Sequence, residues 1–244
     1  MKILSITELN LSEQANKFIS DFIGLLNKPL QIIELPDDYP NFACVSPNPV
    51  FYAIGIRTNI NKTDLEANLC HELYHAYQIS IGFPTVKGYA PDTSKFCENL
   101  RSTILDLSDN EVIKAYGLNY DNVIRTRYRQ CKRYCETSFR EINNPFAKDL
   151  FTIDLILDLS DFPHIQQKKI LKKLSACLPD VYSKYNTYHN VIFEQYDYHT
   201  KEGCLNIFAY IFDDIGLWQN CSINYLGQDI RTKQEFEQLN NLPI

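Results

Sequence analysis

The sequence predicts an α+β fold in which a small sheet and one motif-bearing helix form a core, followed by a mostly helical C-terminal half. Short apolar, β-branched runs bounded by Pro, Asn and Asp are concentrated before residue 60. From residue 61 onward apolar residues recur at spacings of three and four, which is typical of amphipathic helices. Pro and Gly are scattered and form no linker. We therefore expect a core over 1–118 and a helical subdomain over 119–244, packed on the core.

The composition is that of an ordinary globular chain, with 244 residues, 45% hydrophobic and 22% charged. No apolar run approaches the roughly 18 residues that a membrane span requires. A net charge of −6 argues against nucleic acid and anionic membranes as partners. The N-terminus lacks the pattern of a secretory signal, and the eight cysteines form no CxxC pair. We therefore expect a cytoplasmic protein with reduced cysteines.

Four elements are expected before residue 60. Residues 11–26 carry apolar side chains at helical spacing and predict an amphipathic helix. Residues 30–35 predict a short strand, and 41–45 a second one. Residues 50–57 are the clearest strand of the chain, because they are rich in apolar and aromatic residues and are bounded by Pro and Asn. These strands would form the small sheet.

The next element is predicted to be a helix that begins at Thr63 and ends at Gly82. Thr63 and Glu66 have the spacing of a capping box, which satisfies two free amides at a helix start. Gly82, followed by Pro84, is a stop signal. One apolar stripe would pack this helix down: Leu65, Leu69, Leu73 and Ala76.

Residues 71–75 of this helix read His-Glu-Leu-Tyr-His. At about 100° per residue, His71 and His75 differ by about 40°, so both imidazoles project from one face. Two neutral imidazoles at this spacing can bind one Zn²⁺. Glu72 lies beside them, where its carboxylate can take a proton from zinc-bound water. Three polar residues share the histidine side and can orient the ligands: Asp64, Asn68 and Gln78.

A third ligand is expected on a second helix that follows Pro84 and buries an apolar face. Asp106 flanks that face, where a side chain would meet the metal at the seam between the two helices, and we prefer it. Glu98, the alternative, falls 23 residues after His75, but its projection is almost opposite to the apolar face. Asp109 is a third choice. A further interpretation is that all three carboxylates are solvated and that the third metal ligand lies elsewhere in the chain.

Residues 63–84 resemble the active-site helix of the zincin metallopeptidases, and 92–118 are similar, less closely, to certain bacterial metallopeptidases. The resemblance implies a helix packed under a small sheet whose edge strand, here 50–57, holds the substrate backbone. It also implies a zinc-dependent hydrolase that cleaves peptide bonds of a peptide or protein substrate. In that case the catalytic residue is Glu72, and the metal ligands are His71 and His75 with Asp106 or, alternatively, Glu98.

The C-terminal half is expected to hold five helices, over 121–142, 147–160, 165–178, 180–196 and 203–214. The first of these helices is basic although the chain as a whole is acidic, since residues 125–140 hold five Arg and one Lys against one Glu. This contrast favours a second hypothesis: a non-catalytic zincin-scaffold sensor or interaction module that binds an acidic partner through the basic helix 121–142. Tyr120, Tyr128 and Tyr134 could stack on nucleic-acid bases in such a module, although a solvated, internally paired helix face explains the same pattern.

Five side chains are candidate donors to an oxyanion, and their spacing does not choose among them: Tyr89, Tyr185, Tyr188, His189 and His199.

Overall fold

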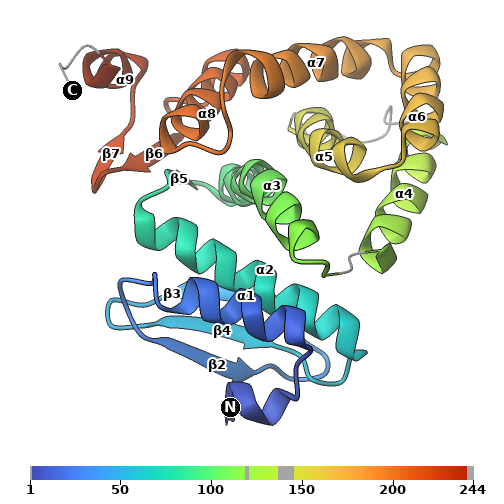
Figure 1. Cartoon of the computed structure of the whole chain (residues 1–244). Coiled ribbons are helices and arrows are strands. Elements are labelled where there is room, and N and C mark those ends of the chain that lie inside the picture. Colours follow the sequence, from blue (N-terminus) through green and yellow to red (C-terminus); the bar gives the residue numbers. More distant parts are fainter. Residues whose placement is uncertain (1, 119–120, 137–145, 241–244) are drawn as a thin grey trace. The chain divides into compact units, whose positions relative to one another are not determined.

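A computed structural model describes residues 2–118, 121–136 and 146–240 (Figure 1). Contacts between residues divide the chain into two units. The first comprises Met1–Gly82 and Ser108–Asn122, and the second comprises Phe83–Leu107 and Val123–Ile244. Small sheets accompany a predominantly helical C-terminal half, so the predicted α+β class is confirmed.

The first unit contains a four-stranded mixed sheet with the strand order β1-β2-β4-β3. Its strands are β1 (Ile3–Leu4), β2 (Leu30–Glu34), β3 (Ala43–Pro47) and β4 (Tyr52–Ile56). β2 and β4 run parallel, whereas β1 and β3 pair antiparallel to their neighbours. A short 3₁₀ helix, Ile6–Leu9, follows β1. The three strands predicted from the sequence therefore form, within one to two residues of their expected bounds.

The edge strand is not the predicted one. β4 was expected at the edge, but it lies inside the sheet between β2 and β3. The reason lies in its side chains, because Tyr52, Ile54 and Ile56 are all fully buried, as is typical of a central strand. β3 takes the edge position and carries exposed Ser46 and Pro47, and Pro is tolerated at sheet edges because it lacks an N–H.

Helices α1 (Glu13–Ile23) and α2 (Lys62–Ile81) lie side by side over one face of this sheet (Figure 1). α2 packs against both β3 and β4. The left-handed Gly82, with φ 89°, ends α2 as predicted.

The start of α2 differs from the prediction. Asn61 is the N-cap, because its side-chain oxygen accepts a hydrogen bond from the Asp64 amide at 2.9 Å. Glu66 forms no capping box. It is buried and accepts hydrogen bonds from the backbone N (2.6 Å) and Oγ (2.8 Å) of Ser12, the N-cap of α1. Hydrogen bonds to two groups of a residue 54 positions away have therefore replaced the predicted local capping box.

Helix α3 (Pro91–Ala115) is continuous and belongs to both units. Its residues up to Leu107 belong to the second unit, and its residues from Ser108 onward belong to the first. The chain thus passes between the units three times, after Gly82, after Leu107 and after Asn122. The last of these points lies four residues beyond the expected boundary at 118, and the first two were not expected.

The remaining helices are α4 (Asp121–Glu136), α5 (Ala147–Asp161), α6 (His164–Cys177), α7 (Pro179–Asn190), α8 (Lys201–Ile215) and α9 (Lys233–Asn240). They belong to the second unit, except for the first two residues of α4. A π-helical turn, Val191–Gln195, continues α7. Helices were predicted near α4 to α8, and the expected residues 137–142 lie outside the described part of the chain. A three-stranded antiparallel sheet was not predicted: β5 (Thr85–Gly88), β6 (Cys221–Tyr225) and β7 (Gln228–Ile230).

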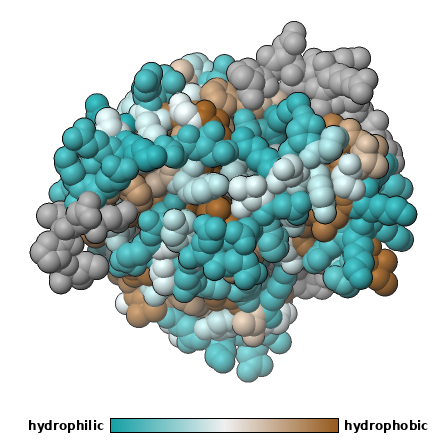
Figure 2. All heavy atoms as spheres, turned by 90° about the horizontal axis from the view of Figure 1, so that it is seen from above, coloured by the Kyte–Doolittle hydropathy of each residue, from teal (hydrophilic) through white to brown (hydrophobic). Residues whose placement is uncertain are grey.

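Across the described residues, no helix combines the length and the apolar character needed to cross a membrane. On the face drawn in Figure 2, hydrophobic residues occur as scattered patches among hydrophilic ones.

Candidate metal centre

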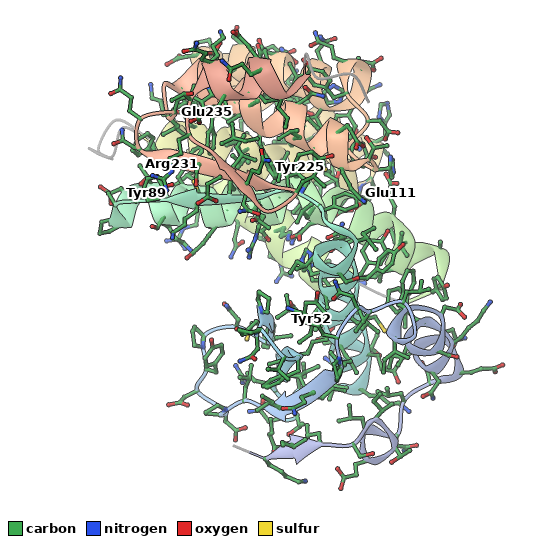
Figure 3. The ribbon with its side chains drawn as sticks, turned by 90° about the vertical axis from the view of Figure 1, so that its left-hand side faces the viewer. Tyr52, Tyr89, Glu111, Tyr225, Arg231 and Glu235 are labelled. Atoms are coloured by element: carbon green, nitrogen blue, oxygen red, sulfur yellow. The ribbon has the colours of Figure 1, made fainter. Side chains whose placement is uncertain are left out.

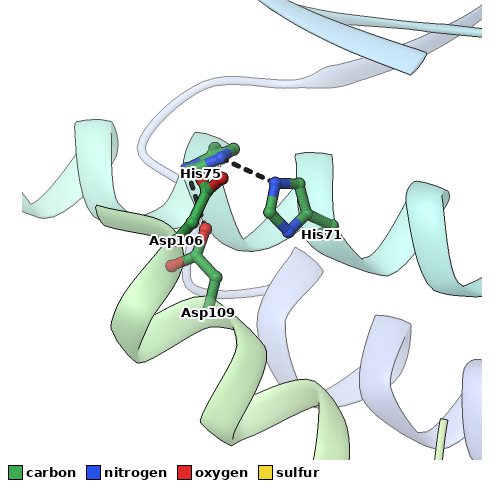
Figure 4. A group of neighbouring side chains, drawn as sticks. All are labelled: His71, His75, Asp106 and Asp109. Atoms are coloured by element: carbon green, nitrogen blue, oxygen red, sulfur yellow. Dashed lines mark hydrogen bonds and ion pairs between the residues drawn. The ribbon is translucent and has the colours of Figure 1, made fainter. Parts of the chain in front are cut away.

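The two histidines of α2 face one another. Nε2 of His71 lies 3.0 Å from Nε2 of His75, and the ring centroids are 4.5 Å apart with an interplanar angle of 83° (Figure 4). This arrangement follows from the helix, since residues four apart project from the same face one turn apart. The two Nε2 atoms therefore converge beside α2.

Two aspartates of α3 complete the cluster. Asp106 and Asp109 are one helical turn apart, and both side chains are buried, with 5% and 0% of the residue exposed. One ligand atom each from His71, His75, Asp106 and Asp109 lies within 4.8 Å of the others (Figure 4). Asp106 also accepts a hydrogen bond from the Ser102 hydroxyl at 3.1 Å. The preferred third ligand therefore lies in the cluster, and so does Asp109.

Asp109 contacts the far side of the His75 ring. Its Oδ2 lies 2.8 Å from Nδ1 of His75, and the Gln78 side-chain oxygen lies 3.1 Å from the same nitrogen. Two acceptors at Nδ1 favour the tautomer that carries its proton there, which leaves the lone pair on Nε2. Carboxylates that orient metal-binding histidines make this same contact.

Gln78 and Asp109 are themselves linked through Ser108. The Gln78 amide donates to the Ser108 hydroxyl at 3.0 Å, and that hydroxyl lies 3.4 Å from Oδ1 of Asp109. All three residues are buried, so this closed ring of contacts fixes the His75 imidazole from behind. Gln78 was expected on the histidine side, whereas Asn68 instead donates to the backbone oxygen of Asp64 within α2. Ser108 was missed, and only its position next to Asp109 could have indicated it.

The residues present fit a metal ion. Two ligand nitrogens on one tetrahedral ion, at bonds of about 2.05 Å, are about 3.3 Å apart, close to the 3.0 Å between the two Nε2 atoms. Two imidazoles and a carboxylate form a donor set that zinc and ferrous sites both use. The cluster can therefore hold a metal ion, and the donor set does not single out zinc.

Glu72 lies next to the cluster on α2 but is not a member of it. The side chain is partly exposed. Burial raises the pKa of the Cys44 thiol on β3, and the charge of Glu72 raises it further. The Glu72 side chain is therefore close enough to Cys44 for its charge to act on that thiol. This partly exposed carboxylate directly follows His71 in the chain.

Glu98, the alternative third ligand, lies outside the cluster. Its side chain is 66% exposed and pairs with Lys95 on the same helix at 3.7 Å. The helical projection had indicated a water-facing side chain, and the structure agrees.

The basic helix α4 is only partly an exposed cationic face. Arg127 lies 3.7 Å from Asp158 and 3.5 Å from Asp161, and the Tyr128 ring packs edge-on against Phe162 at 5.4 Å. Tyr128 is therefore a packing residue. Four cations of α4 are exposed: Arg125, Arg129, Lys132 and Arg133. Tyr120, the Tyr134 side chain and Arg140 lie outside the described residues.

The five oxyanion-donor candidates all belong to the second unit. Tyr188 is buried and donates to Asp214 at 2.7 Å, and burial raises the pKa of Tyr185 to about 12. Tyr89 lies on the surface, where the Arg231 guanidinium covers its ring at 5.5 Å (Figure 3). These contacts give each of the three tyrosines a structural explanation.

Comparison with known protein families, with curated proteins and with solved structures found no match for the chain.

Proposed function

We propose that the protein is a zinc-dependent hydrolase of peptide bonds, of the HExxH type. The observation that carries the proposal is the convergence of two imidazole Nε2 atoms, 3.0 Å apart, beside the buried aspartates of α3. His71, His75 and Asp106 would hold the ion. Asp109 would orient His75, since its carboxylate already contacts Nδ1.

A zinc ion bound there supplies a Lewis acid that acidifies water to a pKa of about 7 and polarises the scissile carbonyl. Glu72 is the proposed general base and acid. Its carboxylate accepts a proton as a water oxygen bonds to the carbonyl carbon, and returns it to the nitrogen as the C–N bond breaks. Its partial exposure supports this role, because the group must meet the substrate.

The edge of β3 supports a peptide as the substrate. The Asn48 amide donates to Phe51 and the Arg57 amide to Phe42, both at 2.9 Å, so even-numbered residues of this strand turn their backbone groups toward β4. The backbone groups of Ala43 and Val45 then point away from the sheet. An extended peptide can add to such an edge by main-chain hydrogen bonds.

A cytoplasmic location belongs to the same proposal. None of the eight cysteines, all of which lie in the described part of the chain, forms a disulfide, which agrees with a reducing compartment.

Glu72→Gln tests the proposal. We expect hydrolysis of a quenched-fluorescence peptide library to be lost, while zinc per chain, measured by mass spectrometry of the metal, stays near the wild-type value. Glu98→Gln is the matched control, because it neutralises an exposed carboxylate of α3, and it should retain full activity. Hydrolysis that survives in Glu72→Gln would refute the role of Glu72.

A second candidate is the interaction module that binds an acidic partner through α4. The exposed cations at 125, 129, 132 and 133 favour it. In that case, reversing these charges would abolish partner binding, and Glu72→Gln would change nothing measurable.

A further inference from the structure

Two cysteines that are far apart in the sequence meet inside the second unit. Cys97 lies on α3 and Cys221 is the first residue of β6, and both are buried, with 1% and 0% of the residue exposed. They pack in the same hydrophobic core. Their thiols are free and are joined to one another by a hydrogen bond. This pair is independent of the proposed hydrolysis.

The backbone around β5 explains why the two cysteines meet. Gly88, the last residue of β5, is the strand partner of Cys221. A Cβ at Gly88 would clash with the backbone of Thr93, so β5 approaches the first turn of α3 as closely as only glycine allows. The Ser94 hydroxyl donates to the Gly88 carbonyl at 2.9 Å and holds this approach. Cys97 lies one helical turn beyond Thr93 and therefore shares the face of α3 that meets β6.

The two sulfurs are not equivalent. Cys221 makes hydrogen bonds with both the Cys97 thiol and the Thr93 hydroxyl. The bond with Cys97 lowers the pKa of the Cys221 thiol, burial opposes this effect, and the bond with Thr93 adds to it. The same contact between the thiols, together with burial, raises the pKa of Cys97. Because the thiolate is the nucleophilic form of cysteine, Cys221 is the sulfur that should react first.

A small oxidant can reach this pair through the turn before β6. Gln219 and Asn220 directly precede Cys221, and both are exposed. An exposed turn opens locally at a lower cost in free energy than the core around it. Hydrogen peroxide is only slightly larger than water, so a local opening of this turn is enough to admit it.

We propose that Cys97 and Cys221 form a reversible disulfide when the protein meets a hydroperoxide. The Cys221 thiolate bonds to one peroxide oxygen, the O–O bond breaks, and the departing oxygen takes up the proton that the Cys221 thiol has lost. The Cys97 sulfur then bonds to the Cys221 sulfur as the S–O bond of the sulfenic acid breaks, and the Cys97 proton leaves with that oxygen as water. The two sulfurs lose one electron each, and the peroxide takes up both. A dithiol reverses the reaction by thiol–disulfide exchange.

Peptide mapping of the whole protein after brief treatment with hydrogen peroxide tests the proposal. After alkylation in denaturant, two of the eight thiols should have escaped the reagent. Digestion without reductant should release one pair of peptides joined through Cys97 and Cys221, and dithiothreitol should separate the pair. Cys177→Ser is the matched control, because it removes an exposed thiol, and it should form the bond as the wild type does.

Two further variants test the order of the two steps. Cys97→Ser should stop at the sulfenic acid of Cys221, which dimedone captures, whereas Cys221→Ser should give no dimedone adduct at Cys97. The thermal unfolding midpoint shows whether each variant is folded. Oxidised wild-type protein without the joined peptides, or with them only in urea that unfolds the chain, would overturn the proposal. A dimedone adduct at Cys97 in folded Cys221→Ser protein would contradict the assignment of Cys221 as the first sulfur to react.

Discussion

Replacing Asp109 by Asn removes the negative charge that faces Nδ1 of His75 at 2.8 Å and keeps the size of the side chain. If Asp109 orients His75 and does not bind the ion, zinc affinity should fall by about 10-fold to 100-fold, which is the usual cost of losing such a contact. That corresponds to about 1.4–2.8 kcal/mol. Asp106→Ala, which removes a proposed ligand, should cost more than Asp109→Asn.

The assay is a competition titration of each purified variant against a chromophoric zinc chelator at fixed pH. Glu98→Gln serves as the control and should bind zinc as the wild type does, because its side chain is exposed and outside the cluster. A larger loss in Asp109→Asn than in Asp106→Ala would show that the two aspartates have exchanged roles. Unchanged affinity in both variants would refute the cluster as a zinc site.

Three further predictions concern stability. Leu73→Ala should destabilise the protein by about 2–5 kcal/mol in urea unfolding, because Leu73 is 1% exposed and truncation leaves a cavity; a loss under 1 kcal/mol would contradict its place in the core. Glu66→Ala should cost about 1.5–3 kcal/mol in the same assay, because the two Ser12 groups lose a charged acceptor, and a neutral effect would show that the bond to α1 contributes nothing. Asp154→Asn should raise the unfolding midpoint at pH 8 but not at pH 4. Burial among its neighbours raises the pKa of Asp154 to about 6 in the folded state, so the folded protein holds this proton more tightly than the unfolded chain and loses stability as pH rises from about 4 to 6. A variant that is less stable than the wild type at pH 8 would contradict that sign.

Elements set by local periodicity could be predicted from the sequence. The strands near 30–35 and 50–57 and the helix ending at Gly82 are encoded by neighbouring residues. The sheet formed by β5, β6 and β7 could not be predicted, because Val86 pairs with Ile223, more than a hundred residues away. For the same reason the order of strands, which puts β3 at the edge, required the structure.

In the candidate metal centre, too, the local geometry could be predicted from the sequence and the long-range contacts could not. His71, Glu72 and His75 share one stretch of helix, so their mutual geometry follows from the rise and twist of α2. Asp106 and Asp109 were both candidates, but the choice between ligand and orienting residue depends on which atom of His75 each one meets. Spacing along the chain contains no such information, and the orienting role that we propose for Asp109 rests on its 2.8 Å contact at Nδ1.

Anomalous diffraction at the zinc edge, from crystals of protein purified without chelators, tests the central claim most directly. We expect one peak about 2.0–2.1 Å from Nε2 of both His71 and His75, with an Asp106 oxygen as a further ligand. Crystals with no anomalous peak between the two rings would contradict it.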